Sequence, residues 1–580
     1  MTDALTHPST PETPNGADRT LPRLVRETLP LALDVAIEVA KLNGVCIRPI
    51  EMRRLDTHTG TVETFNIPCG TTQEAKCPPC AKRNQQLRRA QCREGWHLDH
   101  EPVAEPHPST EDQRWLIEFR ADVQAKRDAA EQAREHEQVA DWDAAIESID
   151  AEINAVGMRG NVLGGRATPR RSRSTRRRQD APDLPRRAKQ NTTLGRTFIA
   201  PDGRVYRPSL FVTLTLPSYG KIRAGQGVPV DPSTYDYARA ARDALHFAKL
   251  VDRFVQNLRR VAGYDVQYFA TVEPQKRLAP HLHMAIRGTL PRAEIKAIAA
   301  ATYHQVWWPA VDEVRFDGEH LPIWTERADL PDGAAYPDGQ AGEYLDPATG
   351  ELLPTWDEAL DRLDADDTAE PLHVVRFGPQ VDVQGLLAGS PDAHARIGYL
   401  TKYLTKNLGD PLDPDDPSTD DPARRDHAAR MVEALRYEPC SPTCANWLRY
   451  GIQPKGAKAG MVPGRCKGKA HKPEHLGYAG RRVLVSRKWS NKTLREHKAD
   501  RRAWVLDMLG LPDDTPTDPH RYVWRPVSAK DPTRTPLAKR LLREVANRQR
   551  TRARRAELEA RADGRPVPDL SATPALGVAA

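Results

Sequence analysis

Hydrophobic runs with two different periods stand out in the middle of the chain. Runs typical of strands occur at 210–216, 266–273, 281–286 and 372–377. A helical period occurs at 237–261, and Gly263 follows it as a stop signal. Strands and helices in this mixed order predict an α+β domain.

The run at 281–286 carries polar chemistry on one face. Because side chains alternate along a strand, His281 and His283 share one face and the apolar residues between them share the other. If the two neighbouring strands pair antiparallel across the 274–280 loop, Glu273 lies opposite His281 and Thr271 opposite His283. Glu273, His281 and His283 are therefore candidate ligands of a catalytic divalent ion. Mixed nitrogen and oxygen ligands favour Mn²⁺, although cellular availability can favour Mg²⁺.

A predicted helix at 390–409 carries a second polar stripe. Ser390 suits its N-cap, Pro391 its first position and Gly409 its stop. Helical spacing places four polar residues on one side, namely Tyr399, Lys402, Tyr403 and Lys406. The residues on a second stripe can be buried, namely Ile397, Leu400, Leu404 and Leu408.

Together the two stripes indicate phosphate chemistry on a nucleic acid. A divalent ion polarises a scissile phosphate. An attacking tyrosine must lose a proton from a phenol whose ordinary pKa is about 10, and Lys402, Lys406 or the metal could stabilise the charge. The product would be a protein–DNA phosphotyrosine bond and a free 3′-hydroxyl. Each stripe alone is more often structural, and their order behind the Thr-rich strand at 210–216 supports the interpretation.

Two groups of cysteines have the spacing of metal ligands. The first group contains Cys69, Cys77, Cys80 and Cys92, with His97 and His100 as alternative fourth ligands. The second group contains Cys440, Cys444, Cys466 and His471, with His475 as a competitor. Both groups predict structural Zn²⁺, the alternative being buried free thiols. Cys46 is left over.

Charge and hydropathy restrict the partners and the compartment. The net charge is +7, with basic clusters at 166–189 and 449–502 and an acidic run at 410–426. This distribution favours a nucleic acid over a membrane. The polar residues 1–20 lack a signal core, and the apolar run at 29–40 is too short to span a bilayer, so we expect a cytoplasmic protein.

The chain resembles the HUH endonucleases that initiate rolling-circle replication. Three motifs carry the resemblance in the family's order: the strand Phe211-Val-Thr-Leu-Thr-Leu216, the pair His281-Leu-His283, and the helix with Tyr and Lys. The doubled Tyr399-x-x-Lys402-Tyr403-x-x-Lys406 is similar to the two-tyrosine initiators of single-stranded DNA phages. The whole chain resembles replication initiators of actinomycete plasmids and integrative elements, through the stretches 69–92, 398–406, 447–454 and 480–490.

The resemblance implies an antiparallel sheet of the ferredoxin-like or RRM-like type, metal-dependent nicking at an origin, and an acidic third metal ligand that matches Glu273. Because no P-loop occurs in the sequence, unwinding would come from a host helicase and extension from a host polymerase. The rivals are an HUH transposase or relaxase with the same chemistry, and a non-catalytic zinc-containing DNA-binding regulator. The regulator would explain the cysteines but not the histidine and tyrosine stripes.

These observations divide the chain into eight predicted segments. They are a disordered stretch at 1–22, an N-terminal four-cysteine zinc module at 23–110, a charged helical segment at 111–160, a basic linker at 161–195, an HUH nickase domain at 196–409 with an acidic insertion at about 309–369, an acidic linker at 410–430, a C-terminal zinc-binding basic DNA-binding module at 431–510, and a basic mobile tail at 511–580. The fifty prolines agree with several modules joined by linkers.

Overall fold

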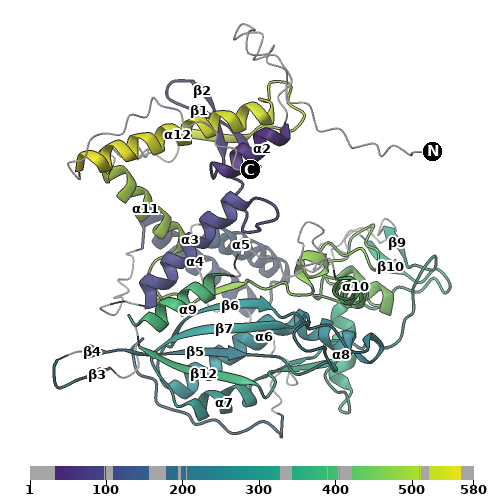
Figure 1. Ribbon diagram of the computed structural model, residues 1–580. Helices are drawn as coiled ribbons and strands as arrows, with labels where there is room; N and C mark the ends of the chain where they lie inside the picture. The colour runs from purple at the N-terminus through teal and green to yellow at the C-terminus, as the bar shows by residue number, and fades with distance from the viewer. Residues whose placement is uncertain are drawn as a thin grey trace, which may run out of the picture. The chain divides into compact units, whose positions relative to one another are not determined.

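The computed structural model describes two compact units (Figure 1). It covers residues 33–96, 98, 109–155, 158, 178–193, 197–203, 205–326, 342–387, 389–402, 404, 421–508, 510 and 521–562. The first unit takes its residues from Met1–Glu94, His394–Asn407 and Lys492–Ala580, and the second from Gly95–Ala393 and Leu408–Asn491. Each unit is therefore assembled from segments that lie far apart in the sequence.

The second unit is built on a five-stranded antiparallel sheet with the strand order β12-β5-β7-β6-β13. Its strands are β5 (Pro208–Leu214), β6 (Gln267–Pro274), β7 (Pro280–Arg287), β12 (Val381–Leu387) and β13 (Val483–Val485). The predicted strands at 210–216, 266–273 and 281–286 are confirmed as β5, β6 and β7, which occupy the three central positions. The two edge strands were not predicted.

One face of this sheet forms the main hydrophobic core. It packs against α6 (Tyr237–Ala262) and α7 (Arg292–Ala301). On β7 the core residues are Leu282, Met284 and Ile286, which lie opposite Leu214, Val212 and Leu210 of β5. Burial of one side of every strand leaves the alternate side chains, including both histidines, on the other face. Gly263 ends α6 with a φ of 72°, as the sequence predicted.

The predicted insertion folds together with the second group of cysteines. Within it, β9 (Ile323–Glu326) pairs with β10 (Gly342–Leu345), and α8 (Trp356–Ala365) follows. Trp356 packs against Trp447 with ring centroids 4.8 Å apart, and Tyr344 shares a core with Leu448. The insertion and the segment around Trp447 therefore belong to one hydrophobic module.

Other elements complete the second unit. They are α4 (Glu111–Ala133), α5 (His136–Ala155), β3 (Phe198–Ile199), β4 (Val205–Tyr206), η3 (Pro232–Thr234), β8 (Tyr303–Val306), β11 (His373–Arg376), α10 (Pro422–Tyr437), η6 (Ala445–Tyr450), η7 (Lys469–His471) and η8 (Pro473–His475). The charged segment at 111–160 is a helical pair, because α4 packs against α5 through Leu116, Val123, Ile149 and Ile153.

The described part of the first unit contains a three-stranded sheet and five helices. The sheet has the order β14-β1-β2, formed by β1 (Ile50–Asp56), β2 (Val62–Ile67) and β14 (Tyr522–Pro526). The described helices that lie wholly or mainly in this unit are α2 (Leu33–Leu42), α3 (Pro78–Trp96), α9 (Pro391–Lys402), α11 (Leu494–Met508) and α12 (Leu537–Ala562). At the start of α11, Glu496 N donates to Thr493 Oγ1 at 3.2 Å and Thr493 N donates to the Glu496 carboxylate, so the two residues form a capping box.

The tail at 511–580 was predicted to be mobile, and its described part is instead folded. β14 pairs with β1, from Met52 opposite Pro526 to Asp56 opposite Tyr522. The Arg-rich α12 buries Leu541 and Val545 against Ala40 of α2. Apolar residues one helical turn apart therefore hold this segment in place despite its basic composition.

Several predicted linkers fall partly on the described residues. Within the basic linker at 161–195, Arg187 donates to the carbonyl oxygen of Val261 at 2.6 Å and pairs with Glu294 at 2.6 Å. Within the acidic linker at 410–430, α10 begins at Pro422 with Asp421 as its N-cap. The stretches at 1–22, 161–177 and 410–420 lie outside the described residues.

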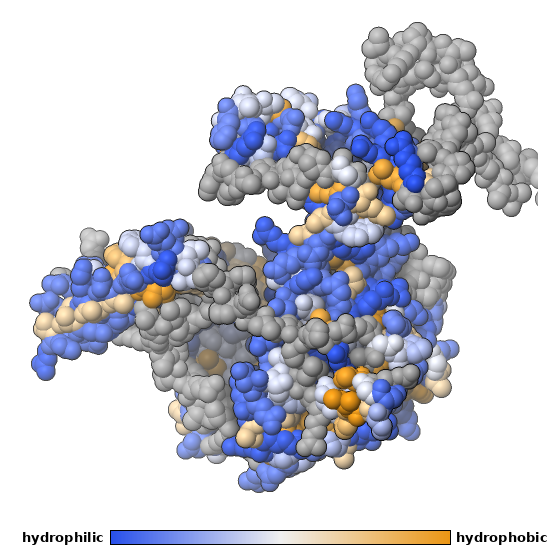
Figure 2. Space-filling model, turned by 90° about the vertical axis from the view of Figure 1, so that its left-hand side faces the viewer, coloured by the Kyte–Doolittle hydropathy of each residue, from blue (hydrophilic) through white to orange (hydrophobic). Residues whose placement is uncertain are grey.

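The described residues thus form a mixed α+β protein with antiparallel sheets, as predicted. Hydrophilic side chains dominate the visible surface, and hydrophobic side chains form small patches (Figure 2). None of the described helices combines the length and the hydrophobicity that a bilayer-spanning segment requires.

Candidate functional site

His281 and His283 lie on the face of the central sheet opposite the main core, which we call the histidine face. The pairing of β6 with β7 determines which other residues share it. Glu273 lies opposite His281, and Thr271 lies opposite His283. This predicted register is confirmed. The connecting turn is closed by a hydrogen bond from Gln275 N to Ala279 O at 2.9 Å and accommodates Leu278 with a φ of 64°. The longer loop therefore does not shift the pairing.

His283 is held between two strands by both ring nitrogens. Its Nε2 lies 3.0 Å from Glu273 Oε2, and its Nδ1 lies 3.1 Å from Thr213 Oγ1 of β5. An ionised carboxylate only accepts hydrogen bonds, so Nε2 carries the proton and Nδ1 accepts from the threonine hydroxyl. The ring also stacks on Phe211, with centroids 5.9 Å apart, and it is 5% exposed. His283 therefore has a fixed orientation.

His281 has one nitrogen without a partner. Its Nδ1 lies 2.6 Å from Gln275 Nε2, and the Oε1 of the same amide accepts from Arg277 Nε at 2.7 Å. Its Nε2 is buried and has no hydrogen-bond partner among the described residues. Burial, His283 and Arg277 lower the pKa of His281 to about 3, so the imidazole is neutral at pH 7. A neutral imidazole with an orphaned buried nitrogen suits a metal ligand.

The histidine face is an incomplete metal site as it stands. The two imidazole rings lie close together, with centroids 4.3 Å apart. Among the described residues, however, Glu273, His281 and His283 are not a group whose ligand atoms all lie within 4.8 Å of one another. A metal here would replace the contact between Glu273 and His283. It would also require His281 to carry its proton on Nδ1 and the Gln275 amide to turn.

The tyrosine helix is α9 (Pro391–Lys402). Ser390 Oγ caps it by accepting from Ala393 N at 3.2 Å, and Ile397 and Leu400 of the predicted apolar stripe are buried. Tyr399 is half-buried and Lys402 is exposed. Tyr403, Lys406 and the predicted stop Gly409 lie outside the described residues. Tyr399 and Lys402 belong to the first unit and the histidine pair to the second, so their approach to one another stays a prediction.

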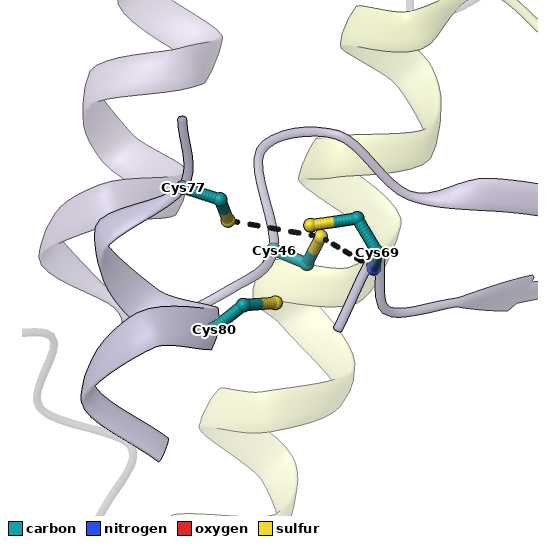
Figure 3. Close-up of side chains that lie close together, drawn as sticks. All are labelled: Cys46, Cys69, Cys77 and Cys80. Carbon is teal, nitrogen blue, oxygen red and sulfur yellow. Dashed lines mark hydrogen bonds between the residues drawn. The ribbon is translucent and has the colours of Figure 1, made fainter. Parts of the chain in front are cut away.

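The first group of cysteines differs from the predicted one in one member. Cys46, Cys69, Cys77 and Cys80 bring their sulfur atoms within 4.8 Å of one another (Figure 3). Cys46 Sγ lies 3.9 Å from Cys77 Sγ and accepts a hydrogen bond from Cys69 N at 3.3 Å. Although burial opposes it, backbone hydrogen bonds from Cys80 and Ile47 lower the pKa of Cys77, which favours the thiolate that metals bind.

The prediction of Cys92 as the fourth ligand was wrong. Cys80 and Cys92 lie on the same continuous helix, α3, and twelve residues of α-helix separate them by about 18 Å. Cys92 is fully buried, and burial raises the pKa of its thiol. It is therefore a core residue. The alternative ligands His97 and His100 lie outside the described residues.

The second group of cysteines is the predicted one. Cys440, Cys444, Cys466 and His471 bring one ligand atom each within 4.8 Å of the others. Cys444 Sγ lies 3.5 Å from His471 Nε2, and His471 Nδ1 lies 3.0 Å from the carbonyl oxygen of Leu435. That carbonyl places the ring proton on Nδ1, so Nε2 is available to a metal. The competitor His475 is not part of this group.

Three supporting residues were missed by the sequence interpretation. Cys46 was left over because Cys92 completed a closer spacing, although the helical sequence around Cys92 could have excluded it. Thr213 lies within the Thr-rich strand motif, but its hydrogen bond to His283 depends on strand order. Gln275 lies in the turn, where no periodicity indicates the direction of its side chain.

Comparison with known proteins is consistent with this combination of sites. The family described as replication initiator protein, pSAM2, matches residues 32–547 of the chain. A replication initiator protein of Streptomyces ambofaciens is 33% identical over 153 residues, which cover 18% of this chain and 33% of that protein. The chain thus matches a third of the length of that relative, and no solved structure shows a significant match. Because the family match extends over most of the sequence, the chain belongs to the pSAM2 replication initiator protein family.

Proposed function

We propose that this protein starts rolling-circle replication by nicking one DNA strand at the origin of a plasmid or integrative element. The observation that carries the proposal is the polar face of the central strands, where Glu273 faces His281 beside His283. The orphaned Nε2 of His281 supports a divalent ion at this face. The HUH identity of the sheet is part of the same proposal.

In the proposed reaction the phenol oxygen of Tyr399, on α9, or that of Tyr403 attacks a backbone phosphorus. The phenol loses its proton, a bond from oxygen to phosphorus forms, and the bond from phosphorus to the 3′ oxygen of the preceding nucleotide breaks. The products are a 5′-phosphotyrosine linkage and a 3′-hydroxyl that a host polymerase extends. The strand is rejoined by the reverse attack, so no external energy source is needed.

Each remaining residue has a defined role. Glu273, His281 and His283 would hold Mg²⁺ or Mn²⁺, and the bound ion supplies charge neutralisation at the scissile phosphate. Lys402 and Lys406 stabilise the phenolate or the phosphate oxygens. Thr213 and Gln275 orient the two imidazoles through their Nδ1 atoms.

The two clusters with four ligands would hold structural Zn²⁺. Three or four sulfur ligands with at most one imidazole are typical of closed zinc sites. Both clusters join segments that are distant in sequence, which is consistent with a structural role. DNA unwinding would be supplied by a host helicase.

Covalent trapping on single-stranded origin DNA tests this function. We expect a 3′-end-labelled strand to become attached to the protein in the presence of Mn²⁺ or Mg²⁺ and to resist denaturation. The 5′ fragment should be released with an extendable 3′-hydroxyl. Replacing both nucleophiles (Tyr399→Phe with Tyr403→Phe) should abolish the adduct, whereas Tyr437→Phe, on α10, should not.

The position of the cut separates initiation from its rivals. Cleavage within a plasmid-type origin is expected, and the family match favours it. Cleavage at transposon ends would instead indicate a transposase. An adduct that persists in the double Phe variant would show that another residue is the nucleophile, and DNA binding without any adduct would indicate a regulator.

A further inference from the structure

A groove in the first unit gathers positive charge from four helices. Its volume is about 800 Å³, and its cationic lining residues are Lys41, Lys82, Arg83, Lys402, Arg548 and Arg552. They come from the end of α2, the first turns of α3, the end of α9, and two successive turns of α12. Among the described lining residues, Glu74 is the single carboxylate, so six cations face one anion.

The protein does not neutralise the arginines of this groove. Within the described residues, neither Arg83, Arg548 nor Arg552 forms an ion pair. Arg83 and Arg552 donate only to backbone carbonyls, at 3.5 Å to Gly44 O and at 3.2 Å to Asn43 O. Partial burial and the nearby Arg552 and Arg83 lower the pKa of Arg548. Crowded like charges of this kind are unfavourable unless an anion joins them.

Arginines of α12 that lie outside the groove do form ion pairs. Farther along the same helix, Arg555 pairs with Glu559 at 2.7 Å and Arg561 pairs with Glu557 at 2.5 Å. These are ordinary i, i+4 pairs of an exposed helix. On the inner part of the helix, Glu544 lies one turn before Arg548 but accepts a hydrogen bond from Asn66 Nδ2 at 3.3 Å, and among the described residues it forms no ion pair with Arg548.

The groove is continuous with the tyrosine helix. Gln85 of α3 donates through Nε2 to the carbonyl oxygens of Thr401 and Lys402, at 2.8 Å and 3.3 Å. Gln85 also lines the groove, so the end of α9 is anchored at its edge. Lys402 follows Tyr399 by three residues and lies on the same side of the helix.

Three residues that line the groove are close neighbours of the first cysteine cluster in the sequence. Cys77 and Cys80 enclose Pro78 and Pro79, which line the groove at the start of α3. Gly44, which also lines it, precedes Cys46 by two residues. The positive end of the α3 dipole therefore adds to the charge of the arginines.

We propose that this groove binds the phosphodiester backbone of the DNA strand on which Tyr399 acts, an inference that rests on the proposed function. Arginine guanidinium groups bind phosphate oxygens through paired hydrogen bonds, and each nucleotide supplies one negative charge. Because the described lining residues include no aromatic side chain, the groove contacts the backbone and leaves the bases unread. Binding in the groove is therefore independent of base sequence.

Salt dependence of binding by the full chain tests the groove. We would measure fluorescence anisotropy of labelled single-stranded oligonucleotides, of origin and scrambled sequence, over a range of KCl concentrations without divalent ions. Arg548→Gln with Arg552→Gln should flatten the plot of log K against log salt by about 0.7 for each lost phosphate contact, equally for both sequences. Arg548→Lys with Arg552→Lys should retain most of the slope.

The matched control lies on the same helix. Arg550→Gln with Arg561→Gln changes the net charge by the same amount outside the groove, and its slope should equal that of the unmodified protein. Equal slopes for the groove and control variants would overturn the proposal. So would a poly-glutamate chain that binds the unmodified protein more tightly than DNA of equal charge and loses this binding in the groove variant, because the groove would then receive an acidic protein segment.

The result of the salt-dependence test can be distinguished from the result of the nicking test. Tyr399→Phe with Tyr403→Phe should leave the salt slope unchanged while abolishing the covalent adduct. An unmodified protein without any adduct would refute the nicking. The slope difference would still establish a phosphate-binding groove in that case.

Discussion

The cysteine clusters and the histidine face are both candidate metal sites, but they are built in opposite ways. Each cluster already brings four ligand atoms within 4.8 Å of one another. The histidine face has two imidazoles and one carboxylate, and that carboxylate is engaged with His283 while His281 Nε2 has no partner among the described residues. Four ligands close a site, whereas three leave positions for a substrate. The comparison therefore separates candidate sites where a metal would support the fold from a candidate site where a metal would take part in the reaction.

Loss of a cluster ligand should have the largest effect on the fold. Cys444→Ser should remove one of two bound zinc ions and unfold the module that contains Trp447, because roughly 10 kcal/mol or more of metal-binding energy supports such sites. Zinc content by mass spectrometry and the thermal unfolding curve measure both effects.

Two variants of the first cluster sharpen this result. Cys46→Ser should lose one zinc ion, whereas Cys92→Ser should keep both and lose only packing energy in the core. The reverse pattern would show that the four sulfur atoms of Figure 3 are not the metal ligands.

Loss of a histidine should act on the reaction and spare the fold. His281→Ala should lower metal-dependent nicking by about 10³-fold, as expected for several kcal/mol of transition-state stabilisation. Its unfolding temperature should stay constant or rise slightly, since the variant removes a buried nitrogen without a partner among the described residues. Rate measurements with Mn²⁺ and a melting curve provide the two readouts. Nicking at the original rate would exclude His281 as a ligand.

Loss of the threonine that orients His283 should have a smaller effect. Thr213→Val removes the hydroxyl 3.1 Å from His283 Nδ1. We expect the affinity for Mn²⁺ to fall by about tenfold, which titration of the nicking rate with Mn²⁺ would detect. Thr215→Val is the matched control, because the Thr215 hydroxyl donates to the carbonyl oxygen of Gln380 instead. Equal Mn²⁺ affinities of the two variants would contradict the orienting role.

Substitution of His246, a buried histidine outside the histidine face, should have the smallest effect. It should change only the stability of the fold and not the reaction. Burial, His304, His373 and Arg242 lower the pKa of His246 to about 3 from 6.5. The unfolded chain therefore takes up the proton first. This contribution to stability is present above pH 6.5 and is lost as the pH falls towards 3.

Substitution of His246 tests whether stability falls in this way as the pH is lowered. Between pH 7 and pH 5 the loss should amount to about 2 kcal/mol at most. His246→Phe should reduce the pH dependence of urea unfolding. An unchanged pH dependence in the Phe variant would show that His246 is not held neutral.

Local periodicity accounts for the part of the fold that could be predicted. Alternation along β7 assigned both histidines to one face, and the register with Glu273 followed from antiparallel pairing. The helix around Tyr399 followed from its cap and its apolar stripe. Features of this kind depend on residues close in sequence.

Long-range pairing accounts for what could not be predicted. β14 pairs with β1 across more than four hundred residues, and no local pattern indicates that partner. Trp356 and Trp447 were assigned to different segments because their contact depends on the folded module. The apolar stripe of α12, with Leu541 and Val545, was hidden by its many arginines. Cys46 was missed for a different reason, because Cys92 offered a closer spacing although it lies on one helix with Cys80.

The most direct test of the central claim is to identify the residue that becomes attached to DNA. After reaction with single-stranded origin DNA and nuclease digestion, mass spectrometry of the proteolytic peptides should find a nucleotide phosphate on Tyr399 or Tyr403. The modification should be absent from the His281→Ala variant. Attachment to any residue other than Tyr399 or Tyr403, or equal attachment without His281, would contradict the account.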